Sequence, residues 1–350
     1  MTYKLTNSAG TIGSTRVSAP KSTRARSVRT ALRWLATALL LAWLARTTDW
    51  HTVGPTLAGA SPSWILAAAL CYFASQLASV ARWRLLIRAT GLAASFPRLL
   101  AAYFEGMFVN LCLPTSIGGD VLKVLRIGGT RSKQAAATTV VADRASGVVA
   151  LILLLGLGIL LRLDSPLAKT FVPLALAASI LIGVMVLVVG RSALARVETS
   201  AHILGRLLRA TPIITKAPWP RVIAWALVVQ GLNVAAVAAA AQAIGANISV
   251  AGLLIATETA SLAAALPVSV AGIGVREATL PMLLAADGVP RAAAIALGLT
   301  WSAIVLAIGM VGGIGHVIEQ RRAARESVAI VPIPLKQIKL AADSRPKAAA

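Results

Sequence analysis

Two stretches decide the fold: EGMFVNLCLPTSIGGDVLK at residues 105–123 and ETASLAAALPVSVAGIGVR at residues 258–276. They align without a gap at an offset of 153 residues, the distance from Glu105 to Glu258. Leucine and alanine matches are common in so apolar a chain. Matches of a glutamate, a proline, a serine, a glycine and a cation in one register are not. The further matched pairs are Pro114 with Pro267, Ser116 with Ser269, Gly119 with Gly272 and Lys123 with Arg276. We interpret the two stretches as copies of an internal repeat.

The composition places both copies in lipid. Apolar residues make up 57% of the 350 residues, charged residues make up 13%, and the mean hydropathy is +0.80. These values lie outside the range of soluble globular proteins. The apolar residues are gathered in long blocks, and a helix that crosses a bilayer core needs about 20 such residues. The blocks are 64–80, 148–161, 171–189, 222–244 and 292–311. The sequence therefore predicts an all-α polytopic membrane protein.

The net charge of +22 does not indicate nucleic-acid binding. The basic residues lie in loops and tails without interleaved aromatic residues, as expected from the positive-inside bias and from attraction to anionic lipids. Cys71 and Cys112 lack metal-ligand spacing, and the three histidines, His51, His202 and His316, are isolated. We therefore predict no metal site, no nucleophile–histidine pair, no cofactor and no catalytic residue.

Basic residues also orient the helices. Residues 47–81 contain no Lys or Arg, whereas four arginines follow the second predicted helix: Arg82, Arg84, Arg88 and Arg98. The positive-inside rule places that end in the cytoplasm. The segment 99–114 has basic residues on both sides, which indicates a hairpin that enters the membrane and returns. The segment 253–284, which contains Pro267, Gly272 and Gly274, is predicted to form a second hairpin, entered from the outside.

The full crossings are predicted near residues 34–44, 64–80, 136–161, 171–189, 222–244 and 292–313. A basic amphipathic stretch at 195–210 is expected along the cytoplasmic face. The result is about six full transmembrane helices plus two broken re-entrant hairpins, arranged as an inverted repeat of the kind found in transporters. The expected location is a bacterial inner (plasma) membrane, with both termini in the cytoplasm.

The domain organisation follows from the same pattern. Residues 1–30 contain no acidic residue and are predicted to form a basic disordered cytoplasmic tail; a transit peptide is the alternative. Residues 31–320 form the transmembrane domain, with half-repeats at about 31–162 and 170–318. Residues 321–350 form a cytoplasmic C-terminal tail.

Glu105 and Glu258 lie on the entering arms of the two hairpins. An ionised side chain within the hydrocarbon is costly and usually faces a partner or a watery cavity. Either the two glutamates carry a proton or hold a cationic group, or each forms a structural pair with an arginine or a backbone N–H.

The loop LPTSIGGD at residues 113–120 breaks the first hairpin, because proline removes a donor and the double glycine, Gly118 and Gly119, frees the backbone. A helix that resumes after Gly119 would point its N–H groups into the protein, where they could bind phosphate together with Lys123 and Arg126. Asp120 has a second interpretation as an N-cap. The second loop offers a similar backbone with Arg276.

Asp143 and Arg144 begin an otherwise apolar helix. In one interpretation Arg144 marks the cytoplasmic headgroup level and Asp143 neutralises it. In the other, Asp143 or Arg144 pairs with Arg276 or Glu277 of the other half and forms a gate.

Three motifs, LPTSIGGDVLKVLR at 113–126, VVADRASG at 140–147 and LPVSVAGIGVREATL at 266–280, resemble the lysylphosphatidylglycerol synthase transmembrane-domain family, also called flippase-like domain proteins. The resemblance covers roughly residues 30–320. It implies handling of a membrane lipid, with flipping between leaflets. The positions that match the family's motifs are Pro114, Gly118, Gly119, Asp120, Asp143, Arg144, Pro267, Gly272, Gly274, Arg276 and Glu277. Aminoacyl-transferring members carry a large soluble catalytic domain after the membrane part, and this sequence does not contain one, which argues against lysyl transfer.

The leading hypothesis is therefore a lipid flippase that binds a headgroup bearing phosphate or amine between the hairpins. One alternative is a lipid-modifying transferase, and another is a membrane subunit that acts with a separate lipid-synthesis enzyme. The expected substrate-binding residues are Glu105, Asn110, Pro114, Ser116, Gly118, Gly119, Asp120, Lys123, Arg126, Asp143, Arg144, Glu258, Pro267, Ser269, Gly272, Gly274, Arg276 and Glu277.

Overall fold

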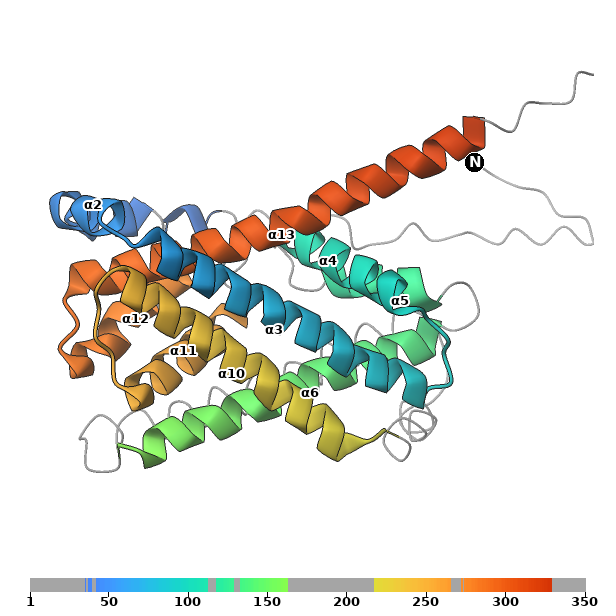
Figure 1. Ribbon diagram of the computed structural model, residues 1–350, viewed down its shortest axis with the longest axis horizontal. Helices are drawn as coiled ribbons and strands as arrows, with labels where there is room; N and C mark the ends of the chain where they lie inside the picture. Colours follow the sequence, from blue (N-terminus) through green and yellow to red (C-terminus); the bar gives the residue numbers. More distant parts are fainter. Residues whose placement is uncertain are drawn as a thin grey trace, which may run out of the picture.

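The computed structural model describes residues 35, 37–39, 42–112, 118–128, 133–162, 217–265, 272 and 274–328. The regular elements of these residues are all helices (Figure 1). They are α2 (Trp50–Ala58), α3 (Pro62–Ala89), α4 (Phe96–Cys112), α5 (Gly118–Gly128), α6 (Lys133–Leu160), α10 (Trp219–Ala243), α11 (Val250–Ala265), α12 (Val275–Leu284), the 3-10 turn η1 (Ala285–Asp287) and α13 (Arg291–Val328). The predicted all-α fold is confirmed.

Four described helices are long and apolar enough to cross a membrane: α3, α6, α10 and the part of α13 from Arg291 to Gly315. The chain is thus a multi-pass membrane protein. The first apolar block falls on a shorter helix, Thr37–Thr47. The predicted crossing at 171–189 and the amphipathic stretch at 195–210 lie outside the described residues.

The paired arms α4–α5 and α11–α12 form the two predicted hairpins, and the element order repeats. In each half a long helix (α3 or α10) is followed by a hairpin (α4–α5 or α11–α12) and a second long helix (α6 or α13). Packing obeys the same symmetry, since α4 packs against α13 of the other half and α11 packs against α6. The most extensive helix–helix interface joins the equivalent helices α3 and α10.

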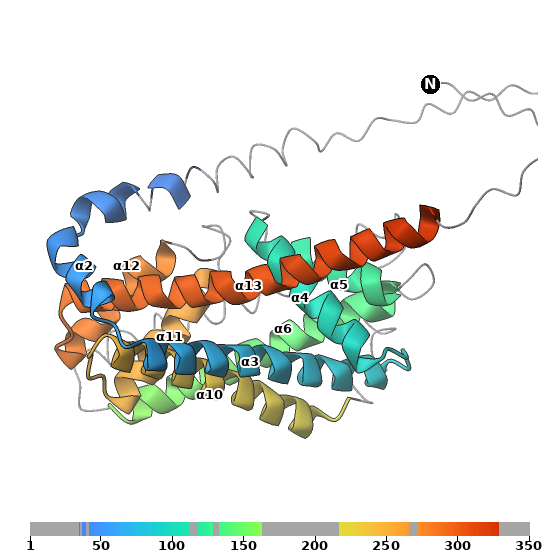
Figure 2. The same ribbon diagram turned by 45° about the horizontal axis from the view of Figure 1, so that its top comes forward.

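The halves are inverted relative to each other. The N–H of Ser61, just before α3, donates to the carbonyl of Ala243, the last residue of α10, at 2.8 Å. α3 and α10 are therefore antiparallel, and Figures 1 and 2 show them side by side. The first hairpin starts and ends near the end of α3, whereas the second starts and ends near the end of α10. The two hairpins thus enter the bundle from opposite ends, as transporter inverted repeats do.

Apolar side chains cover both the inside and the outside of the bundle. On α6, Leu151 and Leu155 are buried, while Leu153 and Leu157 are about half exposed at 50% and 45%. A helix that is apolar all round is typical of a membrane span. At the centre, Tyr72 of α3 packs edge-on against Trp301 of α13, with ring centroids 5.1 Å apart.

The second helix ends later than the sequence suggested. Pro62 occupies the first turn of α3, where its missing N–H costs nothing, and the helix continues to Ala89 with Arg88 in its last turn. Arg82 therefore lies inside α3 and is only 6% exposed. The expectation that Arg82, Arg84 and Arg88 follow the helix was wrong, because all three lie within α3. Asp143 neutralises the buried Arg82.

Candidate functional site

Glu105 and Arg126 join the two arms of the first hairpin. The carboxylate of Glu105 on α4 is 2% exposed and accepts two bonds from Arg126 on α5. Arg126 Nε lies 2.9 Å from Oε2, and Nη2 lies 2.8 Å from Oε1. Two parallel charge-assisted bonds are the strong form of this pair. Of the two interpretations of Glu105, the structure contains the arginine pair.

The start of α5 packs directly on α4. A Cβ added to Gly106 would lie 2.8 Å from the carbonyl oxygen of Gly119, so the backbones meet where both residues are glycine. The N–H of Gly119 donates to Oδ1 of Asn110 at 2.7 Å. This N–H was expected to be open to phosphate. It is instead bound by a side chain of α4, so Asn110 caps α5.

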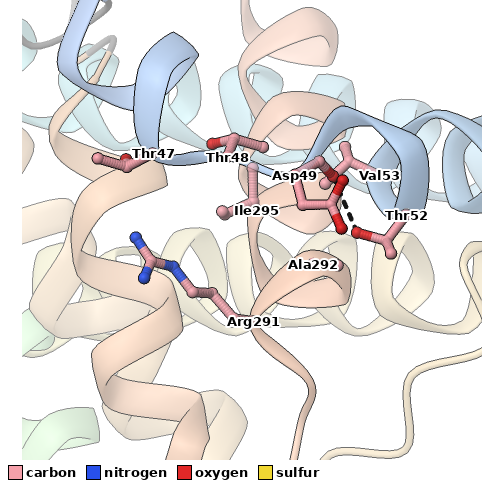
Figure 3. A pocket seen from close by; sticks show the side chains of 8 residues that line it. All are labelled: Thr47, Thr48, Asp49, Thr52, Val53, Arg291, Ala292 and Ile295. Carbon is pink, nitrogen blue, oxygen red and sulfur yellow. Dashed lines mark hydrogen bonds between the residues drawn. The ribbon is translucent and has the colours of Figure 1, made fainter.

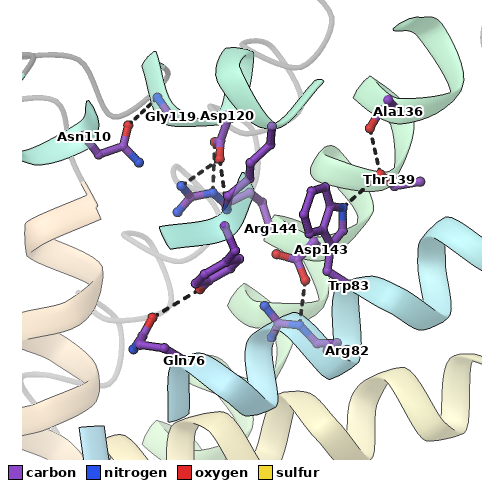
Figure 4. Close-up of polar contacts among 12 residues, drawn as sticks. Gln76, Arg82, Trp83, Asn110, Gly119, Asp120, Ala136, Thr139, Asp143 and Arg144 are labelled. Atoms are coloured by element: carbon purple, nitrogen blue, oxygen red, sulfur yellow. Dashed lines mark hydrogen bonds and ion pairs between the residues drawn. The ribbon is translucent and has the colours of Figure 1, made fainter. Parts of the chain in front are cut away.

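Asp120, Lys123 and Arg144 form a charged cluster at the inner end of α5 (Figure 4). Asp120 Oδ2 lies 3.1 Å from Nε of Arg144, and its Oδ1 lies 3.6 Å from Nζ of Lys123. Asp120 therefore binds cations of α5 and α6 and is not the helix cap that one interpretation gave it. The Arg144 side chain is 46% exposed, which makes it the most exposed member of this cluster.

Lys123 is held in an aromatic box. Its side chain is 8% exposed, and Nζ lies 4.1 Å from the ring centroid of Tyr103 and 5.7 Å from that of Trp83. The indole N–H of Trp83 donates to Oγ1 of Thr139 at 3.0 Å, which fixes the ring. A cation over aromatic faces is stabilised by the ring quadrupoles. Lys123 is thus an internal partner and not an exposed phosphate ligand.

Asp143 pairs with a residue that the sequence analysis assigned to a loop. Oδ1 of Asp143 on α6 accepts from Nε of Arg82 on α3 at 2.8 Å, and both residues are 6% exposed. The proposed gate that joined Asp143 or Arg144 to Arg276 or Glu277 was wrong for the conformation seen here, because both form pairs within the first half.

Glu277 fixes the start of α12. Gly272 and Gly274 have φ values of 77° and 86°, which only glycine adopts without strain. Oε2 of Glu277 accepts from the N–H of Gly274 at 2.8 Å, and Oε1 accepts from the Ser302 hydroxyl at 2.5 Å. The carboxylate is 1% exposed and ties α12 to α13.

Glu258 on α11 is in a different situation from its partner in the repeat. It is 0% exposed, and neither carboxyl oxygen has a hydrogen-bond partner in the part of the chain that the structure describes. The guanidinium of Arg276 on α12 lies near the C-terminal end of α11, beyond Glu258. A Cβ added to Gly272 would meet Ala264 Cβ at 2.6 Å and Arg276 Cζ at 3.4 Å.

Four predicted site residues, Pro114, Ser116, Pro267 and Ser269, lie outside the described residues. The structure brings Glu105 to Arg126, Asn110 to Gly119, and Asp120 to Lys123 and Arg144. It adds Arg82, Trp83 and Tyr103, which the sequence analysis missed. One signal pointed to Arg82, because an arginine at the end of an apolar block requires an acid, and the chain has only 12 acids.

A hollow lies away from these clusters, between the start of α13 and the residues before α2 (Figure 3). Arg291, Thr48 and Asp49 contribute polar side chains to its lining. Asp49 caps α2 by accepting from the N–H of His51 at 3.0 Å. None of the residues that line this hollow belongs to the Asp120 cluster.

The chain matches a known family. The family described as lysylphosphatidylglycerol synthase TM region matches residues 30–313, which is more than half of the chain. The chain therefore belongs to this family, and the expected resemblance is confirmed. No curated protein matches the chain.

Proposed function

We propose that this member of the lysylphosphatidylglycerol synthase TM region family is a lipid flippase that moves a polar-headed lipid between leaflets. The observation that carries the proposal is the pair of helical hairpins that enter the bundle from opposite ends and carry the buried Glu105 and Glu258. Inverted hairpins of this kind place substrate sites near the middle of the membrane in transporters. Family membership supports the assignment to lipid chemistry.

The headgroup is proposed to bind at the Asp120–Lys123–Arg144 cluster. Arg144 offers exposed N–H donors to a phosphate, and Asp120 offers carboxylate oxygens to an amine. Next to the cluster, Val121 and Leu125 of α5 are 48% and 50% exposed and present an apolar surface to acyl chains. The substrate class is therefore a lipid whose headgroup bears a phosphate or an amine.

The orientation is part of the proposal. Arg84 and Arg88 lie at the end of α3, Arg98 lies at the start of α4, and Lys133 lies at the start of α6. By the positive-inside rule this end faces the cytoplasm of a bacterial inner membrane. Both termini are then cytoplasmic. Alternating rocking of the two halves would expose the site to each leaflet in turn.

The description of the family names a synthase, which supports one alternative function. In that alternative the chain is a membrane subunit or lipid-modifying transferase that acts with a separate catalytic protein. The two functions differ in what happens to the lipid. A flippase changes its leaflet and leaves its chemistry intact, whereas a transferase changes its headgroup.

The test is reconstitution of the full chain into vesicles that contain fluorescent anionic, zwitterionic or aminoacylated phospholipids. Leaflet-selective quenching measures flipping, and mass spectrometry of the same vesicles measures headgroup modification. The proposal expects protein-dependent flipping of at least one lipid without modification. Folded protein that flips no lipid, or that modifies the lipid once a cytosolic extract is added, would contradict the flippase.

A further inference from the structure

The two repeat copies differ in the residue available to neutralise the buried carboxyl group. Glu105 and Glu258 are equivalent in the repeat, and so are Arg126 and Thr279. In the first half Arg126 neutralises Glu105 through two bonds. In the second half the shorter Thr279 carries no charge, and its hydroxyl donates to the carbonyl of Arg276, 3.2 Å away in its own helix.

The face of α11 that carries Glu258 packs against apolar residues. Ile255 and Leu262 lie one turn before and after Glu258, so they share its face. Both pack in one cluster with Leu151 and Leu155 of α6. An ionised carboxylate in such surroundings is strongly disfavoured unless a partner neutralises it.

The charged groups on the neighbouring helices are engaged elsewhere or distant. On α12, Glu277 binds Gly274 and Ser302, and the guanidinium of Arg276 lies at the level of Ala264, about 9 Å along α11 from Glu258.

The other two helices that pack on α11 give the same result. On α6, Asp143 and Arg144 bind Arg82 and Asp120. On α10, the charged residue of the helix is Arg221, in its first turn at the end remote from α11, and Asn233 donates to Gln230 at 2.9 Å.

We propose that Glu258 is the proton-binding group that drives lipid movement, whereas Glu105 is a structural residue; this inference rests on the flippase function. A proton needs one carboxyl oxygen, whereas a Ca²⁺ or Mg²⁺ ion takes about six oxygen ligands. In each cycle the Glu258 carboxylate takes one proton from water on one side and becomes neutral. It releases that proton to water on the other side when the halves rock.

The experiment measures flipping by the full chain in proteoliposomes with and without a pH difference across the membrane. An entrapped pH-sensitive dye reports proton movement. With one proton per lipid, a difference of one pH unit shifts the steady-state ratio of labelled lipid between leaflets by up to about tenfold. Wild-type protein is expected to show this shift and to move protons only when the lipid is present.

Three variants separate the roles of the two glutamates. Glu258→Gln, which keeps the shape of the side chain, is expected to lose both the leaflet shift and proton movement. Thr279→Arg places a cation at the position equivalent to Arg126. This variant should also lose the leaflet shift and proton movement, because the new guanidinium pairs with Glu258. The double variant Glu105→Gln/Arg126→Gln removes the first-half pair and should keep the response to pH.

Thermal unfolding of each purified variant checks that it is folded. Lipid flipping by wild type that is indifferent to the pH difference would overturn the role of Glu258 and leave the flippase in place. A Glu258→Gln protein that is folded and still responds would do the same. Absence of flipping by wild type would instead contradict the proposed function itself.

Discussion

Arg126 of α5 donates two hydrogen bonds, of 2.9 and 2.8 Å, to the carboxylate of Glu105 of α4. This ion pair joins the two arms of the first hairpin. The Glu105 side chain is 3% exposed and that of Arg126 is 37% exposed. The carboxylate is therefore shielded from water, and the hydrogen bonds from Arg126 stabilise its charge. Replacement of either partner alone should therefore destabilise the hairpin.

Removal of one partner should cost more than removal of both. We expect Arg126→Gln to lower the free energy of unfolding by roughly 3 kcal/mol, because it takes a paired cation away from a buried carboxylate. The double variant Glu105→Gln/Arg126→Gln should lose less. Thermal or denaturant unfolding in detergent measures the difference, and equal, additive losses would show that the pair contributes no coupling.

The close approach of α4 and α5 predicts a specific intolerance to side chains. Gly119→Ala should destabilise the protein by about 1–3 kcal/mol, because the new methyl group meets the backbone of Gly106. Gly156→Ala on α6 is the matched control, since a Cβ there meets nothing within 4 Å. The control should be neutral or gain up to about 1 kcal/mol from helix propensity. Similar stability of the two variants would contradict the packing seen here.

Arg144 should matter for lipid and little for folding. A half-exposed arginine that donates to a phosphate contributes on the order of 1.5–3 kcal/mol, so Arg144→Gln should slow flipping of anionic lipids about tenfold or more. Arg88→Gln, which changes an exposed arginine in the last turn of α3, is the control and should keep the wild-type rate. If both variants flip lipid at the wild-type rate, the headgroup does not bind at the Asp120 cluster.

The inverted arrangement predicts opposite accessibility of the two hairpin bases. In a background with Cys71→Ala and Cys112→Ser, a cysteine at the exposed Ser95 should react with an impermeant maleimide only from the cytoplasm. A cysteine at the exposed Ala286 should react only from the outside. Labelling of both from the same side would contradict the inverted repeat.

Much of the fold was visible in the sequence because the repeat carries polar residues in register. The offset from Glu105 to Glu258 predicted α11 and α12 as the counterparts of α4 and α5, and the structure confirms it. Hydropathy located α3, α6, α10 and α13, because a bilayer requires long apolar helices. The end of α3 was predicted too early, because three of its last eight residues are arginines and such a cluster is typical of a cytoplasmic loop.

Side-chain partners were harder to predict. The sequence singled out Glu105, Asp120, Asp143 and Arg144, but which charge meets which depends on how helices pack. Arg82 and Asp143 are 61 residues apart in the chain and adjacent in space. The repeat itself suggested equal roles for Glu105 and Glu258, and their different surroundings appear only once Arg126 is seen on Glu105.

The most direct test of the account is the rate of phospholipid flipping by the purified wild-type chain in sealed proteoliposomes, measured by leaflet-selective quenching. If the protein is a flippase, the protein-dependent rate is well above that of empty vesicles, is reduced about tenfold by Arg144→Gln and is unchanged by Arg88→Gln. A folded wild-type protein that leaves anionic, zwitterionic and aminoacylated lipids at the rate of empty vesicles would contradict it.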